Sequence, residues 1–523
     1  ADNTADPSNN TYYEFIQGVQ AEYDLAAIEL ETSPKFANSL DTAISVEGTF
    51  LNLGSQRVSS FEFNYSVNGG SAQTESIRTS LGALGSESFA HNVAFQAPAS
   101  GEIEIAIWAS NINGQLDGNT ANDTLKALVK ISDTIPNIID SIRPVYKIEV
   151  ISSSRDGLSV PTDLDFHPEL DRKELWVINR RSRSQGGATV TYRNAGEANQ
   201  TAELLSDGNA WHFMALPSGI AFSNNGNFAN SASVFNANSP TGDGGQPFTG
   251  PALWSSDPEI YAQFPVNPVI NGSHLDMLHE SPYTMGIAHE VDNAFWVYDG
   301  YSGDIVRYDF VEDHGPGRDD HSDGKIRRFP VPVSKVSQGE DQEIPCHLVL
   351  DKKTNWLYIA DQQAGKVYRL DITSGVSRGP NSGSLIFPNY DGILGEYLAM
   401  RDITYETVID SGITQPSGIE VVNNRLLVSD YSSGDIFIYD ITEGKADYLS
   451  RIVTKNAGIA GIKVGPDGNI WFVNALRDEV SRITQAPTSL AENRFQSQVN
   501  VYPNPSTGII NIDLGDATFE QIG

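Results

Sequence analysis

The N-terminal part of the chain alternates apolar and polar residues in short runs. Clear examples are the runs Ala43–Leu51, Ser60–Val67 and Glu102–Trp108. A period of two places successive side chains on opposite faces of a strand, so each run predicts a half-buried β-strand. Glycine and asparagine turns, such as Asn68–Gly70, separate these runs. The pattern predicts an antiparallel β-sandwich over residues 20–133.

A different pattern repeats six times between residues 161 and 484. In each copy a short apolar strand follows a proline or glycine, and a second apolar strand ends in aspartate or asparagine. The first strands are anchored at residues 161, 217, 284, 345, 416 and 459. Such a unit cannot bury both of its faces alone, so the copies must pack on one another. The repeat therefore predicts a six-bladed β-propeller over residues 155–485, and the predicted fold class is all-β.

The strand order within a blade sorts its loops between two faces of the propeller. If the first strand is innermost, its start and the turn after the second strand lie at one face, here called the funnel mouth. The first hairpin and the turn between strands three and four then lie at the opposite face. The polar residues that end the second strands are predicted to accept hydrogen bonds from nearby backbone amides. These residues are Asn179, Asn236, Asp299, Asp361, Asp430 and Asn474.

Composition narrows the possible partners. The formal net charge of -33 argues against nucleic acid and against anionic membrane surfaces. Cys346 is the only cysteine, so no internal disulfide is possible. No run of 18 apolar residues exists, so we expect no transmembrane segment. The first residues, within an N-terminal segment 1–19, are typical of a mature start after removal of a signal peptide.

Eight of the nine histidines lie between His167 and His347. Several precede a first strand, and one takes a first-strand position that is glycine in four other blades. The metal-ligand candidates of this group are His212, His274, His279 and His347. The ligand-binding candidates beside them are Asp163, Cys346 and Trp254. Imidazoles that converge on the funnel mouth suit Zn or Cu. The alternative is that each histidine caps a turn or stacks on an aromatic ring.

A second cluster lies between predicted strands 304–310 and 325–329. Its candidate metal ligands are Asp313, His314, Asp319, Asp320, His321 and Asp323. This density of acids and imidazoles suits Ca²⁺ or a transition metal, although the spacing is not that of an EF-hand loop. The alternative is a solvated acidic turn paired with Arg327 and Arg328. As a turn between strands three and four, the cluster is expected on the face opposite the histidines.

The C-terminal segment carries the motif Tyr-Pro-Asn-Pro-Ser-Thr-Gly at residues 502–508. It resembles the start of the type A sorting domain of the type IX secretion system of Bacteroidetes, through residues Tyr502, Pro503, Asn504, Pro505 and Gly508. The resemblance implies export by the type IX machinery and an extracellular or outer-membrane-surface location. Over residues 499–523 it covers only the beginning of such a β-type domain, which therefore looks truncated. Residues 486–498 are the expected linker.

Two further resemblances concern the larger domains. The phrases Leu357–Asp371 and Leu427–Asp440 resemble NHL and TolB-like six-bladed propellers. Residues 20–133 resemble the immunoglobulin-like modules of bacterial surface proteins, joined to the propeller by a linker at 134–154. Peptidylglycine amidating lyase has a similar propeller with zinc-bound histidines after its anchor prolines. Here Cys346 holds that place and the other blades lack matching histidines, so the activity of that enzyme does not carry over.

These features predict a secreted or cell-surface propeller that binds a small-molecule, peptide or carbohydrate ligand at the funnel mouth. The alternative is a metal-dependent lyase or hydrolase that uses the histidine cluster. The chain has no Gly-x-Ser-x-Gly elbow, phosphate-cradling loop or His-Glu-x-x-His motif. Whether the chain is an enzyme therefore stays open at this point.

Overall fold

The structure is a computed structural model of the whole chain. It describes residues 20–37, 43–97, 100–239, 241, 244–318, 320–336, 346–380, 394–486, 500–502 and 511–513. These residues form strands and turns, with short helical turns at α1 (Ile139–Ile142), η2 (Ser154–Asp156), η3 (Leu170–Arg172) and α2 (Ala210–Phe213). The predicted all-β fold class is confirmed. None of the helices in this described part has the length and apolar character needed to cross a bilayer.

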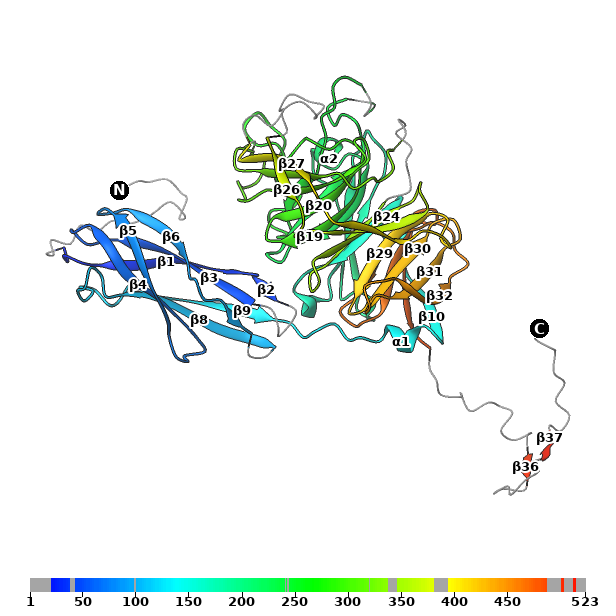
Figure 1. Cartoon of the computed structure of the whole chain (residues 1–523), viewed down its shortest axis with the longest axis horizontal. Helices are drawn as coiled ribbons and strands as arrows, with labels where there is room; N and C mark the ends of the chain where they lie inside the picture. The colour runs from blue at the N-terminus through cyan, green and yellow to red at the C-terminus, as the bar shows by residue number, and fades with distance from the viewer. Residues whose placement is uncertain are drawn as a thin grey trace.

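Two sheets form the N-terminal sandwich (Figure 1). One sheet contains β1 (Leu25–Ser33), β3 (Ala43–Asn52), β6 (Ser86–Ala90) and β7 (Phe95–Gln96). The other has the order β2 (Phe36–Ala37), β9 (Thr124–Ile131), β8 (Gly101–Ser110), β4 (Val58–Val67), β5 (Gln73–Leu81). Buried residues alternate with less buried ones along β3, and Phe50, Phe61 and Phe63 pack together between the sheets. The two-residue period of the sequence therefore separates the core face from the outer face.

Six four-stranded units follow, and each has its strands in antiparallel order. The first three are β11 (Pro161–Phe166), β12 (Leu175–Asn179), β13 (Ala188–Arg193), β14 (Thr201–Leu205); β15 (Pro217–Phe222), β16 (Asn227–Ala232), β17 (Ala252–Ser255), β18 (His274–Met277); and β19 (Thr284–Val291), β20 (Ala294–Asp299), β21 (Asp304–Asp309), β22 (Lys325–Phe329). The next two are β23 (Leu348–Asp351), β24 (Trp356–Asp361), β25 (Lys366–Asp371), β28 (Tyr405–Ile409); and β29 (Pro416–Val422), β30 (Arg425–Asp430), β31 (Asp435–Asp440), β32 (Asp447–Val453). The sixth is β33 (Ile459–Val464), β34 (Ile470–Asn474), β35 (Glu479–Gln485) and β10 (Tyr146–Ser152). The first strands contact one another in a closed ring, which makes the six units the blades of a propeller.

The ring is closed by a strand from outside the repeat. β10 pairs antiparallel with β35 and supplies the outermost strand of the sixth blade. The expectation that residues 134–154 are only a linker is therefore wrong for residues 146–152. Pairing the start of the propeller with its last blade leaves no open seam between blades one and six.

One blade is extended by an insertion from its neighbour. β26 (Val376–Pro380) and β27 (Glu396–Arg401) leave the fourth blade between β25 and β28. β27 then pairs in parallel with β22 of the third blade, which becomes a six-stranded sheet. This insertion accounts for the long spacing between the fourth and fifth anchors.

Glycine recurs in the innermost strands because these strands approach closely at the axis. A Cβ on Gly286 would lie 2.3 Å from the carbonyl oxygen of Cys346, and one on Gly461 would lie 2.4 Å from Oδ1 of Asp163. Only the absence of a side chain permits this packing.

The polar ends of the second strands behave as the sequence predicts. Asp430, for example, accepts hydrogen bonds from the backbone N–H groups of Thr414, Gln415 and Ser432. Asn236 lies beyond the end of β16, but its side-chain oxygen likewise accepts a hydrogen bond from the backbone N–H of Asn238.

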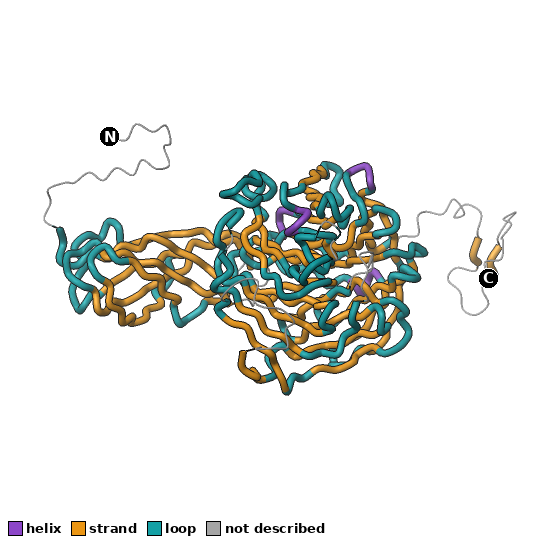
Figure 2. Tube along the Cα trace, turned by 90° about the horizontal axis from the view of Figure 1, so that it is seen from above, coloured by secondary structure: helices purple, strands orange, loops and turns teal. Residues whose placement is uncertain are grey.

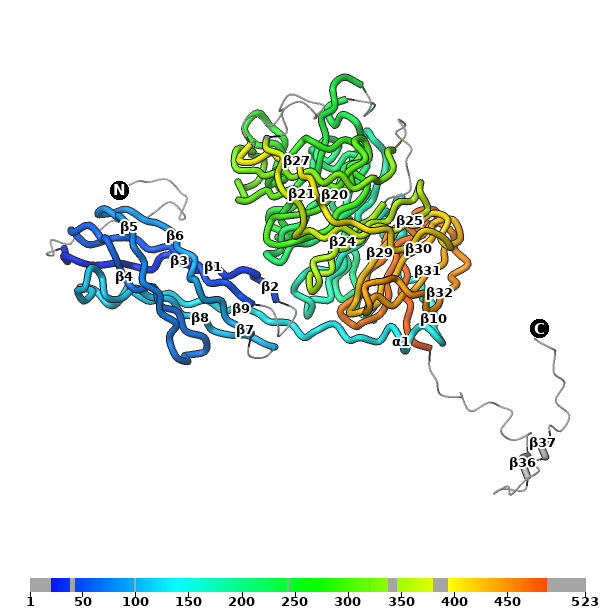
Figure 3. Tube along the Cα trace, viewed as in Figure 1, coloured from blue at the N-terminus to red at the C-terminus, as the bar shows by residue number. Residues whose placement is uncertain are grey.

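The sandwich lies at one side of the propeller (Figure 2). β2 and β9 belong to the part of the sandwich that is nearest the propeller (Figure 3). At the other end of the chain, β36 (Asn500–Tyr502) pairs antiparallel with β37 (Asn511–Asp513). Residues 503–508 of the sorting motif, including Pro503, Asn504, Pro505 and Gly508, lie outside the described residues.

Candidate ligand cavity and histidine–carboxylate cluster

A buried histidine–aspartate pair lies at the propeller axis, near the end where the first strands begin. Nε2 of His347 lies 3.1 Å from the carbonyl oxygen of Thr162, and Nδ1 lies 3.4 Å from Oδ2 of Asp163. Burial lowers the pKa of His347 to about 3, so its imidazole is neutral. Burial raises the pKa of Asp163 to about 7, and the backbone N–H of Ile220 donates to the same carboxyl. These two predicted site residues therefore lie together, but inside the ring of first strands.

Further along the axis, a lysine flanked by two carboxyl groups takes the place of this pair. Nζ of Lys463 lies 3.4 Å from Oε2 of Glu420 and 3.9 Å from Oδ1 of Asp165. Burial raises the pKa of Glu420 to about 7. Burial alone would lower the pKa of Lys463, but the carboxyl groups of Asp165 and Glu420 outweigh it and raise that pKa. The ammonium group is thus held charged between two carboxyl groups.

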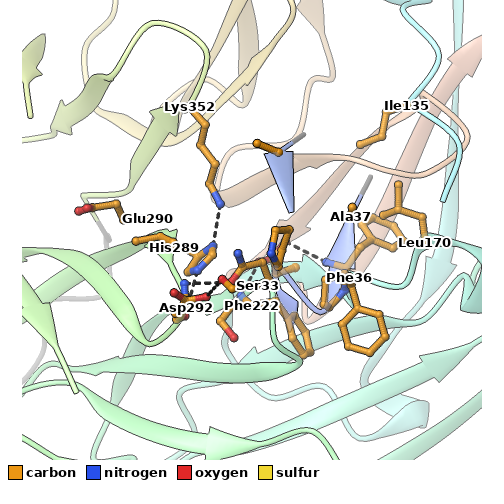
Figure 4. A pocket seen from close by; sticks show the side chains of 18 of the residues that line it. Ser33, Phe36, Ala37, Ile135, Leu170, Phe222, His289, Glu290, Asp292 and Lys352 are labelled. Carbon is orange, nitrogen blue, oxygen red and sulfur yellow. Dashed lines mark hydrogen bonds between the residues drawn. The ribbon is translucent and has the colours of Figure 1, made fainter. Parts of the chain in front are cut away.

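This charged group faces a cavity of about 730 Å³ at the base of the propeller, the face where the first strands end. The cavity walls come from both domains (Figure 4). The propeller supplies Asp165, Phe222, His289, Glu290, Asp292, Lys352, Glu420 and Lys463, among others. The sandwich supplies Ser33, Phe36, Ser45 and Glu47, among others. A volume of this size falls within the range of roughly 300–1,000 Å³ typical of small-molecule sites.

A lysine–histidine contact lies in the cavity wall. Nζ of Lys352 donates a hydrogen bond to Nδ1 of His289 at 2.7 Å, and Nε2 of His289 lies 3.1 Å from the carbonyl oxygen of Asp292. Partial desolvation by the surrounding walls lowers the pKa of Lys352 to about 8, while the residue as a whole remains exposed to solvent. Burial also holds the pKa of His289 well below its usual range, with the ammonium of Lys352 adding to the effect. The sequence around His289 and Lys352 carries no pattern that marks either residue as part of a cavity.

The sandwich docks at this face through its β1–β2 segment. The backbone N–H of Phe36 donates to the carbonyl oxygen of Asn224 at 2.9 Å. The Phe36 ring lies 5.4 Å from the ring of His167, which in turn lies 5.4 Å from Phe222. The hydroxyl of Ser33 donates to Asp292. His167 is therefore buried between the two domains.

The histidines expected at the funnel mouth pack on aromatic rings. His274 stacks on Phe213 with ring centroids 3.5 Å apart, and His279 stacks on Phe248 at 3.8 Å. The ring of His212 lies 5.8 Å from that of His279. Among the described residues, however, His212, His279 and His347 do not form one group of potential metal ligands. The arrangement matches the stacking alternative, and burial lowers the pKa of His212 and of His274 to about 3.

The acidic loop does not lie on a face remote from these histidines. It packs along the outer strand of the second blade, where the backbone N–H of Gly317 donates to the carbonyl oxygen of His274. Nδ1 of His321 lies 2.5 Å from Oδ1 of Asp276, and its ring is 5.9 Å from that of His279. The prediction that the two clusters occupy opposite faces is therefore wrong. His274 opens β18 opposite Trp254, at the base end of the second blade, and the loop follows β18 from there towards His279.

Potential ligand atoms of Asp276, His314 and Asp323 lie within 4.8 Å of one another. Nε2 of His314 lies 3.0 Å from Oδ1 of Asp323. Sequence reasoning included His314 and Asp323 but missed Asp276, which is fully buried within β18. The other loop candidates, Asp313 and Asp320, accept hydrogen bonds within the loop itself.

Two of the remaining candidate site residues, Trp254 and Cys346, are buried. Trp254 is fully buried in the second blade and donates from Nε1 to Oδ1 of Asn230 at 2.6 Å, so its side chain is not open to a ligand. Cys346 is buried, and burial raises the pKa of its thiol to about 12. Asp319 lies outside the described residues, and Tyr502 is described only as part of β36.

No protein-family model matches the chain, and a search of curated proteins finds no match. Solved structures do resemble it. An auxiliary nutrient binding protein from Bacteroides ovatus is 12% identical, with 88% of this chain and 98% of that chain covered and a TM-score of 0.40. Regucalcin, a calcium-binding protein from Agrobacterium tumefaciens, is 12% identical over 64% of this chain and 93% of that one, with a TM-score of 0.39. Virginiamycin B lyase from Staphylococcus aureus is 13% identical over 65% and 99%, with a TM-score of 0.36. At these values the likenesses carry no functional argument.

Proposed function

We propose that the chain is a secreted or cell-surface binding protein that takes a small cationic ligand into the cavity at the base of the propeller. The observation that carries this proposal is the cavity of about 730 Å³ between sandwich and propeller. It combines apolar walls with several charged side chains, which is the composition of a typical small-molecule site.

The charge of the lining favours a ligand with an amine or another cationic group. Five carboxyl groups line the cavity, namely Glu47, Asp165, Glu290, Asp292 and Glu420, against the two ammonium groups of Lys352 and Lys463. Burial raises the pKa of one of the five, Glu420, to about 7, so it carries only part of a charge near neutral pH. Arg307 pairs with Glu290 at 2.8 Å and offsets one further negative charge. A negative balance remains, and a cation entering such a partly enclosed space is attracted more strongly than in open water.

The base is a better candidate than the funnel mouth. The described residues where the first strands begin, such as Thr162, Ser218 and Ser417, are buried and bonded to neighbouring strands. The histidines that motivated a metal-dependent lyase or hydrolase do not form one ligand set there. No observation therefore favours the enzymatic alternative over binding.

Binding can be tested by calorimetry with lysyl-lysine and spermidine as cationic probes and maltose as a neutral probe. Ser45 lies in the cavity wall on β3, whereas Ser88 is an exposed serine of the same sheet outside the cavity. We expect Ser45→Trp to weaken binding of the cationic probes by narrowing the cavity, and Ser88→Trp to leave it unchanged. Glu47→Gln should weaken binding by about tenfold, since it removes one charge. Equal binding by both tryptophan variants would refute the site.

The route to the cell surface is part of the same proposal. The motif at residues 502–508 supports recognition by a type IX secretion system, and the sandwich would act as an immunoglobulin-like module that also forms one wall of the cavity. Deleting residues 499–523 in the native host should leave the protein in the periplasm. Surface delivery of the shortened chain would refute the sorting role of the motif.

A further inference from the structure

We propose that Asp276, His314 and Asp323 bind a divalent transition-metal ion of the Zn²⁺ class, which fastens a loop of the third blade onto the second blade. The three residues come from two blades. Asp276 belongs to β18, the outermost strand of the second blade, whereas His314 and Asp323 belong to the loop between β21 and β22. A metal at this point would join two structural units that share no strand pairing.

The three side chains are already near ligand spacing. Their potential ligand atoms all lie within 4.8 Å of one another, and His314 Nε2 is 3.0 Å from Asp323 Oδ1. Oxygen and nitrogen ligands at ~2.0–2.2 Å from one tetrahedral ion are themselves about 3.3–3.6 Å apart. His314 and Asp323 remain partly exposed, so a movement of roughly 1 Å in the loop would bring the set to this spacing.

Asp276 supplies an independent reason to expect a cation. Its side chain is 0% exposed, and Oδ1 accepts hydrogen bonds from Nδ1 of His321 and from the backbone N–H of Met277. The second oxygen, Oδ2, is buried without a hydrogen-bond partner. An unsatisfied buried carboxylate oxygen is costly, and a bound cation removes that cost directly.

The donor set selects the kind of ion. An imidazole nitrogen with two carboxylate oxygens suits Zn²⁺ or a related transition ion, whereas Ca²⁺ prefers six to eight oxygen ligands. His321 holds Asp276 by a hydrogen bond, as outer partners of ligating carboxylates do. Three protein ligands leave a fourth position for water, which is consistent with the partial exposure of the loop side.

The loop already contacts the second blade at several points. The backbone N–H of Gly317 donates to the carbonyl oxygen of His274, and the N–H of Asn271 donates to the carbonyl oxygen of Gly317. These contacts hold the loop beside β18 and bring His314 and Asp323 towards Asp276. Binding of the ion should therefore stabilise the loop and slow hydrogen exchange of the Gly317 amide.

The test is calorimetric titration of the tag-free full chain, freed of metal by a chelator, with ZnCl₂ and separately with CaCl₂. We expect one Zn²⁺ site and far weaker Ca²⁺ binding. Asp276→Asn and His314→Gln should each weaken Zn²⁺ binding by at least about 100-fold, and His321→Gln by about tenfold. The matched control is Asp320→Asn, a change in the same loop outside the ligand set, which should alter the affinity less than about twofold.

Two further measurements separate the site from binding at exposed histidines. Co²⁺ in place of Zn²⁺ should give the strong visible absorption of a four-coordinate site in the wild type and in Asp320→Asn, but not in Asp276→Asn. Zn²⁺ should also slow exchange of the Gly317 amide only in variants that bind it. The proposal is overturned if Asp276→Asn and His314→Gln both bind Zn²⁺ like the wild type, if Ca²⁺ binds more tightly than Zn²⁺, or if no Zn²⁺ binds.

Discussion

Arg328 offers a stringent test of what stabilises the third blade. Its guanidinium group is buried, with a side chain 5% exposed. Nη1 donates to Asp299 Oδ2 at 2.7 Å and to Asp304 Oδ1 at 2.9 Å, and Nη2 donates to the carbonyl oxygen of Glu280. Arg328→Met keeps much of the volume but removes the cation, so the buried carboxylate of Asp299 and the partly buried one of Asp304 lose their partner.

Breaking a buried ion pair by removing one partner costs about 3–5 kcal/mol of the free energy of unfolding. The propeller spans residues 146–485. With an unfolding entropy of about 2.1 cal/mol/K per residue, a domain of this size has about 0.7 kcal/mol/K in total. The expected fall in Tm for Arg328→Met is therefore about 4–7 °C.

Arg327→Met is the matched control. Arg327 is the neighbouring residue on β22, is 41% exposed, and pairs with Glu396. Such an exposed pair contributes about 0–1 kcal/mol, so its loss should lower Tm by less than about 1.5 °C. Thermal unfolding followed by tryptophan fluorescence measures both variants. Equal Tm values for the two variants would contradict a stabilising role of the buried ion pair. So would a Tm deficit of Arg328→Met that does not shrink at acidic pH, where protonation of the carboxylates removes the uncompensated negative charge.

Three other predictions follow from single residues. Gly286→Ala places a Cβ against the Cys346 carbonyl oxygen and should destabilise the propeller by about 1–3 kcal/mol in thermal unfolding. Gly82→Ala, in the sandwich with open space around the new Cβ, should not destabilise its own domain, and equal losses in the two variants would contradict the close approach of the inner strands. The thiol of Cys346 should not react with Ellman's reagent until urea unfolds the chain, and rapid reaction of the native protein would contradict its burial. His347 has a folded pKa of about 3, so the unfolded chain binds its proton below about pH 6.5, and stability falls as pH falls through that window. Relative to His347→Gln, the wild type should lose about 2 kcal/mol between pH 7.5 and 5.0 in urea titrations, and parallel pH profiles would contradict this.

Local patterns predicted the strands and the ring, because period-two alternation and the Pro/Gly anchors act within one strand or hairpin. The closure of the ring by β10 was not predictable in this way. Tyr146 pairs with Gln485, so no short window contains both partners. An isolated seven-residue strand next to a linker gives no sign of the blade that it will join.

The site residues show the same division between local and long-range information. Histidines and acids are visible as clusters in the sequence. The face of the propeller on which each cluster lies depends, however, on how a long loop packs, and His321 contacts Asp276 of the neighbouring blade. Asp276 stands in a short run that otherwise reads as an ordinary strand. His289 and Lys352 become cavity residues only because the sandwich supplies the facing wall, and nothing in their own segments encodes that arrangement.

The axis itself explains why the ligand site is proposed at the base. At the first-strand position occupied by Asp163 in the first blade and His347 in the fourth, the other four blades carry glycine. These two side chains therefore fill the space between the inner strands, and burial keeps the imidazole neutral. Glu420 and Lys463 stand two residues after the glycines of the fifth and sixth blades, and therefore lie nearer the base. Charge can persist there because the carboxyl groups surround the ammonium and the cavity supplies solvent. A polar ligand can therefore reach charged groups at the base, whereas at the other end of the axis it would have to displace buried, mutually bonded strands.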